Sequence, residues 1–201
     1  MIYIILIIID LTLIATINAL LGAIGVINMT IDYAIIATLV DFAIMIGIEA
    51  IIALIIHKLP DKLFSPYNRV FKVFKWERGF LEWTRIRKWK EWVPDTGQLC
   101  DFKKNELKGT DTEYIYKFLV ESCYADCIHF WMAFGGFLIM VVNITNVTAM
   151  LTICLPMAII SFFLNLLPML IQRYNRPKLL KVYERNIRLE KTRETVHNLS
   201  K

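Results

Sequence analysis

The chain has 201 residues, 57% of them hydrophobic, and a mean hydropathy of +0.51. Soluble globular domains are usually about half apolar, so this composition argues against an ordinary soluble domain. The formal net charge is +5. Because the basic residues flank apolar stretches, anionic lipid headgroups or phosphorylated substrates suit the chain better than nucleic acid.

Two apolar stretches open the chain. Residues 2–25 contain few polar side chains and, at about 1.5 Å per residue, are long enough to cross a bilayer core of about 30 Å. A cleavable signal peptide is disfavoured, because it would need a positive amino-terminal region and a shorter apolar stretch. A short turn at 25–30 separates this stretch from the second, at 31–56. We therefore predict two transmembrane helices within residues 1–56.

The second stretch carries Asp32, which can sit at the membrane surface, and Asp41 and Glu49, which lie well within the apolar run. Asp41 and Glu49 are eight residues apart, so they fall on nearly one face of a helix. A carboxylate that faces lipid costs at least about 2.5 kcal/mol, so both are expected to face protein or a wet cavity. Two interpretations stay open, namely hydrogen bonds between helices and a polar wall of a substrate cleft.

A long polar segment follows the second stretch. His57 and Lys58 mark a cytoplasmic exit by the positive-inside rule. Aromatic and apolar residues recur at helical spacing in 64–75, which predicts an amphipathic helix in the membrane interface. Residues 76–92 interleave tryptophan with arginine and lysine, which suits the headgroup layer better than a single-stranded nucleic-acid platform. We predict that residues 57–128 form a cytoplasmic amphipathic and catalytic cap.

A further helix is predicted at the end of this cap. Thr110 or Asp111 is placed to cap it, with Glu113 in the first turn, where the helix dipole favours a carboxylate. The apolar stretch at 130–143 is short for a bilayer crossing by itself. We expect the new helix to lengthen it by running continuously through His129.

The end of the chain completes the predicted topology. Residues 143–147 form an external turn, 148–171 form the fourth span, and a basic run follows. The basic loops after the second and fourth spans both predict, by the positive-inside rule, that the two termini are cytoplasmic. The predicted fold is therefore an all-α integral membrane protein of the cell membrane with about four transmembrane helices, the last two within 129–176. Residues 177–201 form a basic cytoplasmic tail, either a charged helix or a disordered arm.

The best catalytic candidates are Glu121, Asp126 and His129. On a helix Glu121 and His129 lie about 80° apart, and Asp126 lies about 60° from His129 on its other side. A carboxylate on one ring nitrogen fixes the imidazole tautomer and leaves the other nitrogen to accept a proton from an alcohol. The alternative is an interfacial histidine with ordinary hydrogen bonds.

A second polar group is Gln172-Arg173-Tyr174-Asn175-Arg176, which Asn165-Leu166-Leu167-Pro168 precedes. Two arginines three residues apart share a helix face and can fork onto phosphate or carboxylate. The alternative is a positive-inside anchor. The four cysteines show no zinc-ligand spacing, so they are expected to be free thiols and no metal site is predicted.

Several short motifs occur in a recognisable order. They are Leu59-Pro60, Lys75-Trp76-Glu77, Lys88-Trp89-Lys90, Pro94-Asp95-Thr96-Gly97, Phe102-Lys103-Lys104, Glu121-Ser122-Cys123, Asn165-Leu166-Leu167-Pro168 and Gln172-Arg173-Tyr174-Asn175-Arg176. Together with Asp126 and His129 they resemble the glycosyl-4,4′-diaponeurosporenoate acyltransferases, which act at the end of staphyloxanthin-type carotenoid synthesis. The chain departs from the family pattern beside the presumed cleft, with Asp126 in place of a glutamate and Phe130 in place of a tryptophan.

The resemblance implies transfer of a fatty acyl group to a sugar hydroxyl of a membrane glycolipid, of which a glycosylated carotenoid is one candidate. His129 would act as general base, and Glu121 or Asp126 would orient it. An activated acyl group such as acyl-CoA would be the co-substrate, and no cofactor is implied. Direct transfer is expected, with Cys123 as nucleophile a minor alternative. The implied substrate-binding residues are Trp89, Lys90, Asp95, Lys104, Asn165, Gln172, Arg173, Tyr174, Asn175 and Arg176.

Two other functions stay open. A non-enzymatic membrane scaffold would use the cytoplasmic cap to recruit a soluble protein. A small lipid transporter would use the acidic residues of the second span, although four spans without an internal repeat disfavour it.

Overall fold

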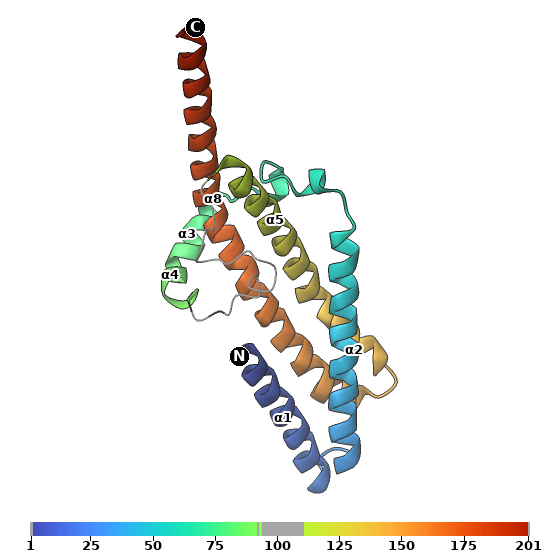
Figure 1. The fold of residues 1–201 in the computed structure, drawn as a ribbon. Coiled ribbons are helices and arrows are strands. Elements are labelled where there is room, and N and C mark those ends of the chain that lie inside the picture. The colour runs from blue at the N-terminus through green and yellow to red at the C-terminus, as the bar shows by residue number, and fades with distance from the viewer. Residues whose placement is uncertain (1, 92, 94–110, 201) are drawn as a thin grey trace. The chain divides into compact units, whose positions relative to one another are not determined.

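The computed structural model describes residues 2–91, 93 and 111–200 (Figure 1). Every regular element in these ranges is a helix, so the all-α prediction is confirmed. Four helical segments are long and apolar enough to cross a membrane, as predicted. They are Ile4–Ala23, Ile31–His57, Thr112–Val142 and Val147–Leu199.

The chain divides into two compact units, which we describe separately. Unit 1 comprises Met1–Lys58 and Ile128–Leu167, and unit 2 comprises Leu59–Cys127 and Pro168–Lys201. The division falls within two continuous helices, α5 (Thr112–Gly135) and α8 (Leu155–Leu199).

Unit 1 begins with the long helices α1 (Ile2–Ala23) and α2 (Ile31–His57). The turn between them ends at Thr30, whose hydroxyl caps α2 by accepting a hydrogen bond from the Tyr33 amide at 3.3 Å. Both helices begin and end within two residues of the predicted spans.

The rest of unit 1 is a chain of shorter helical pieces. After α5 come the 3-10 turn η4 (Gly136–Leu138) and α6 (Ile139–Val142). The predicted turn at 143–147 follows, and then α7 (Val147–Ala149), the π-helical turn η5 (Met150–Cys154) and the start of α8. The Asn18 side-chain amide of α1 donates to the Thr152 carbonyl at 2.9 Å, which ties α1 to the π-helical turn.

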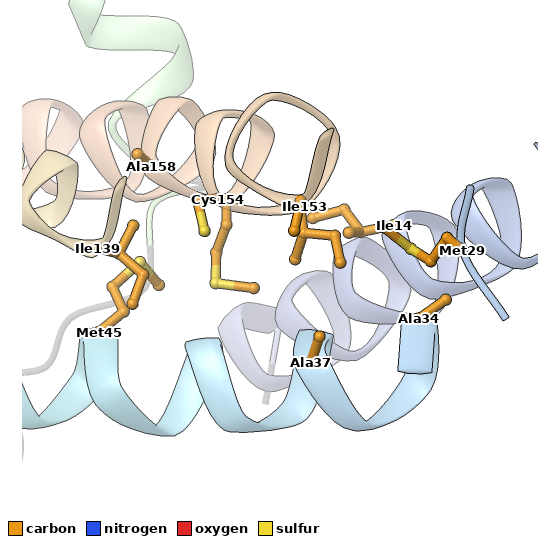
Figure 2. Close-up of a cluster of buried hydrophobic side chains, with 11 residues drawn as sticks. Ile14, Met29, Ala34, Ala37, Met45, Ile139, Ile153, Cys154 and Ala158 are labelled. Atoms are coloured by element: carbon orange, nitrogen blue, oxygen red, sulfur yellow. The ribbon is translucent and has the colours of Figure 1, made fainter. Parts of the chain in front are cut away.

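The core of unit 1 is a cluster of small and flexible apolar side chains (Figure 2). Ala34 and Ala37 of α2 and Ala158 of α8 are buried. Small residues let helix backbones approach closely, and this packing replaces the hydrophobic driving force that lipid does not supply. Met45, Ile153 and other flexible or branched side chains fill the remaining space.

Unit 2 begins with irregular backbone rather than with the amphipathic helix predicted at 64–75. That prediction is wrong, because the 3-10 turn η1 (Asp61–Phe64) ends where the predicted helix would begin, and a second 3-10 turn, η2 (Arg69–Phe71), follows within the segment. The physical reason is Pro66, whose ring excludes the preceding residue from the α-helical region. Ser65 is accordingly extended, with φ −64° and ψ 131°.

Short helices follow in the tryptophan-rich stretch. They are α3 (Lys75–Trp83) and α4 (Ile86–Trp89), which meet at Arg85 in the left-handed conformation, with φ 55°. Trp76 and Trp83 are largely exposed, at 74% and 78% of their surface. Exposed indoles beside cations are the pattern expected of the headgroup layer.

The long helices of unit 2 agree with the sequence. Asp111 caps α5, because its carboxylate accepts a hydrogen bond from the Tyr114 amide at 2.8 Å, and the helix continues through His129 as predicted. Tyr124 of α5 stacks on Phe64 with ring centroids 3.7 Å apart and donates to the Leu59 carbonyl at 2.8 Å. The basic tail is helical, because α8 continues to Leu199.

We predict that Gly22→Ala destabilises unit 1. A Cβ atom at Gly22 would lie 2.0 Å from the Met29 carbonyl oxygen, so the turn between α1 and α2 would have to shift. Overpacking of this kind costs about 1–3 kcal/mol. Gly47→Ala in α2 is the matched control, because nothing lies within 4 Å of its Cβ position.

Thermal unfolding in detergent, followed by circular dichroism, measures both variants. Gly22→Ala should melt at a lower temperature than the parent chain, and Gly47→Ala should melt at the same or a higher temperature because alanine favours helix. Equal melting of the two variants would contradict the close approach at Gly22.

Candidate active site

Asp41 and Glu49, the carboxylates in the middle of α2, both bond to neighbouring segments of unit 1. Asp41 accepts hydrogen bonds from the Asn143 side-chain amide at 2.8 Å and from the Cys154 thiol at 3.3 Å. Glu49 Oε1 accepts from the Ser161 hydroxyl and from Asn165 Nδ2, the latter at 3.4 Å. Hydrogen bonding between helices, the first of the two interpretations, is therefore confirmed for both residues.

Asn165 extends the Glu49 contacts to a histidine. Its side chain is buried, and its Oδ1 lies 3.0 Å from Nδ1 of His129. Its Nδ2 faces the Ser161 carbonyl at 3.1 Å, the Ser161 hydroxyl at 3.3 Å and the Glu49 carboxylate. These four side chains, Glu49, Ser161, Asn165 and His129, form a hydrogen-bonded chain that we call the Glu49–His129 chain.

The orientation of the Asn165 amide determines the histidine tautomer. Three acceptors surround Nδ2, so the amide nitrogen must point at them and Oδ1 must point at His129. Because an amide oxygen only accepts, Nδ1 of His129 must carry the proton. In the neutral imidazole Nε2 then holds the lone pair, which is the arrangement of a general base.

His129 has a partner in this arrangement that the sequence did not suggest for it. Asp126 is 4% exposed, and its Oδ2 accepts from Arg173 Nη1 at 3.0 Å and from Arg176 Nη1 at 2.9 Å. Glu121 lies half-buried on α5. The structure thus brings His129 together with Asn165, which the sequence had placed among the substrate-binding residues.

Asp126 belongs to an ion-pair cluster in unit 2, made of Glu77, Asp126, Arg173 and Arg176. Arg173 forks onto Glu77, with Nε on one carboxylate oxygen and Nη2 3.0 Å from the other. Arg176 is 2% exposed, and it also donates to the Phe71 carbonyl at 3.0 Å and to the Ser122 carbonyl at 2.9 Å. The two arginines therefore pair with carboxylates of the chain itself and hold η2, α3, α5 and α8 together.

The remaining predicted binding residues are spread over unit 2. The Trp89 indole donates to the Thr84 carbonyl at 3.1 Å, and Lys90 pairs with Glu91 at 3.6 Å. Tyr174 is buried, and its hydroxyl accepts from Arg87 Nε at 2.8 Å. This hydrogen bond raises the pKa of Arg87, so the guanidinium stays charged. Gln172 and Asn175 are half-buried, and Asp95 and Lys104 lie outside the described residues.

We predict that Arg176→Met lowers the free energy of unfolding by about 3–5 kcal/mol, because it leaves Asp126 in a buried site without one of its two cations. The control is Arg78→Gln. It removes an exposed pair with Glu82 on α3 and should cost less than about 1 kcal/mol. Thermal or denaturant unfolding in detergent compares the two. A loss for Arg176→Met as small as that of the control would show that the cluster does not stabilise unit 2.

Comparison with known families gives one consistent result. The family model for glycosyl-4,4'-diaponeurosporenoate acyltransferase matches residues 62–185, more than half of the chain. This segment contains His129, Asn165 and all four residues of the ion-pair cluster.

Curated relatives agree with the family match. A glycosyl-4,4'-diaponeurosporenoate acyltransferase from Staphylococcus haemolyticus is 26% identical over 156 residues, which cover 73% of this chain and 84% of the relative. The protein of the same name from Staphylococcus aureus strain N315 is 30% identical over 127 residues, which cover 61% of this chain and 73% of the relative. No solved structure matches the chain. The chain therefore belongs to the glycosyl-4,4'-diaponeurosporenoate acyltransferase family.

Proposed function

We propose that this membrane acyltransferase moves a fatty acyl group from an activated donor to a sugar hydroxyl of a glycolipid, with His129 as the general base. The names of its relatives describe acyl transfer onto a glycosylated carotenoid acid, which supports a glycolipid acceptor of that kind. The observation that carries the proposal is the 3.0 Å contact between His129 Nδ1 and Asn165 Oδ1, because it leaves Nε2 as the basic nitrogen.

The proposed reaction is a direct transfer. The acceptor hydroxyl donates a hydrogen bond to His129 Nε2, its oxygen attacks the acyl carbonyl carbon, and Nε2 takes the proton. As the tetrahedral intermediate collapses, the bond to the donor's leaving group breaks and the imidazolium returns the proton to that group. General base catalysis of this type contributes about 10²–10⁴-fold to the rate.

Asn165 has a positioning role in this proposal. Its Oδ1 accepts from Nδ1–H in both protonation states of the ring, so it holds the imidazole in one orientation and stabilises the imidazolium. Ser161 and Glu49 hold the Asn165 amide in turn. Such a chain is strongest where water is scarce, because hydrogen bonds gain strength at low dielectric.

The surface beside His129 suits lipid substrates. Phe130, Trp131 and Phe134 follow it on α5 and expose 44%, 55% and 52% of their surface. Large exposed apolar rings on a membrane helix contact lipid tails, so a hydrophobic acceptor or acyl chain can approach the histidine within the bilayer. The basic flanks of the spans favour a topology in which both termini are cytoplasmic and the donor arrives from that side.

Cys123 is the alternative nucleophile, and the structure does not favour it. Its side chain has no exposed surface, whereas an acyl-enzyme route would require the sulfur to reach the donor carbonyl. Direct transfer therefore remains the proposal.

We predict that His129→Gln lowers acyl transfer by at least about 100-fold, because glutamine has no basic nitrogen. Asn165→Ala should lower kcat by about tenfold or more with a smaller effect on KM, because it removes the acceptor that orients the ring. Cys123→Ala should keep nearly full activity. The assay measures the mass of the glycolipid product in membranes that contain each variant, supplied with donor and acceptor.

The outcomes separate the alternatives. Full activity of His129→Gln would reject the histidine mechanism, and loss of activity only in Cys123→Ala would favour an acyl-enzyme. If the chain were a scaffold or a lipid transporter, cells with and without it would contain glycolipids of the same mass.

A further inference from the structure

A basic pocket lies between α3 and α8 in unit 2. Val73, just before α3, and Arg78 and Leu81 of α3 form one side, and residues of α8 from Arg173 to Lys181 form the other. Leu81 has no exposed surface, so the floor of the pocket is apolar. An apolar floor lowers the local dielectric and strengthens the charges above it.

The described residues that line the pocket carry positive charge in excess of their ion pairs. Four of its lining side chains, Arg78, Arg173, Lys178 and Lys181, are positively charged, and none of the lining residues within the described part of the chain is acidic. Arg173 is neutralised by the ion-pair cluster, and Arg78 pairs with Glu82 through its Nε at 3.1 Å. Lys178 and Lys181 lie three residues apart, so they share one face of α8 and add two positive charges there.

Tyr174 contacts Lys178 and a second cation, Arg87. The Lys178 ammonium lies over its ring, 3.8 Å from the centroid, and Arg87 donates to its hydroxyl. One buried tyrosine therefore contacts two cations, Lys178 over the face of its ring and Arg87 at its hydroxyl. Repulsion between like charges opposes this arrangement, and a bound anion would relieve it.

We propose that the basic pocket binds a phosphate group that belongs to the acyl donor. This inference rests on the proposed acyl-transfer function and adds to it the chemical class of the donor. The phosphate can come from a soluble carrier such as coenzyme A or from an anionic phospholipid headgroup. Lys178 and Lys181 supply the charge, Arg78 offers guanidinium donors, and Tyr174 positions Lys178.

The test measures binding, so it does not depend on catalysis. The full chain is placed in phosphatidylcholine nanodiscs and titrated with coenzyme A by calorimetry. A second arm uses nanodiscs that also contain phosphatidylglycerol and measures the phosphatidylglycerol that stays bound to the protein, by native mass spectrometry. The variant is Lys178→Gln with Lys181→Gln. The matched control is Arg188→Gln with Lys191→Gln, which removes two exposed charges of the same spacing further along α8.

The pocket variant should weaken binding roughly tenfold or more in one arm, because two positive charges that face the phosphate are lost, and the control should bind like the parent chain. A change in the coenzyme A arm identifies a soluble donor, and a change in the phosphatidylglycerol arm identifies a headgroup. The proposal is overturned if the parent chain binds neither probe, or if the pocket variant and the control behave alike.

His129→Gln separates this inference from the catalytic proposal. It should bind the probe as tightly as the parent chain while acyl transfer is lost. If transfer proves to be independent of His129 but the pocket variant still loses phosphate binding, the catalytic proposal fails and the pocket stands. If transfer requires His129 but the pocket variant binds phosphate like the parent chain, the pocket proposal fails and the catalytic proposal stands.

Discussion

An ionisable side chain inside an apolar helix must find its hydrogen bonds within the protein, because lipid supplies none. Unit 1 meets this constraint at Glu49, which bonds to Ser161 and Asn165, and through Asn165 the chain of contacts reaches His129. The same contacts that make Glu49 tolerable in a membrane span also fix the direction of the Asn165 amide. The histidine tautomer is therefore a consequence of how the helices pack, and the proposed chemistry depends on it.

Unit 2 meets the corresponding constraint with ion pairs. Asp126 and Arg176 are almost fully buried, and each has more than one partner within the cluster or the adjacent backbone. Buried charges of this kind are tolerated only when they are paired and hydrogen-bonded. The basic residues of α8 therefore have two different roles. Arg173 and Arg176 hold the fold together, whereas Lys178 and Lys181 present charge to a pocket.

The sequence predicted the helices well, because long apolar stretches and helix caps are local signals. The four spans, the Asp111 cap and the continuity of α5 through His129 follow from hydropathy, a carboxylate before a helix, and helical spacing. The helix predicted at 64–75 failed because aromatic periodicity was given more weight than Pro66, although the effect of proline on the residue before it is also local.

The site could be predicted only in part. His129 was a candidate because acidic residues lie near it in the sequence, but its partner Asn165 is 36 residues away and belongs to a different helix. Asp126 forms ion pairs with two arginines some 50 residues further along the chain. Contacts at this separation are set by tertiary packing. The sequence held a stronger signal for this site. Ser161 and Asn165 lie four residues apart inside an apolar span, so their polar side chains share one face of α8.

The proposed chemistry depends on a proton at Nδ1 of His129, and nitrogen-15 NMR of the histidine ring detects its position. The chain has three histidines, so a His129→Gln sample assigns the signals of His129. At a pH where the ring is neutral, Nδ1 should carry the proton and Nε2 should not, and Asn165→Ala should allow both tautomers. A ring with the proton on Nε2 in the parent chain, or a tautomer that does not respond to the loss of Asn165, would contradict the proposed mechanism.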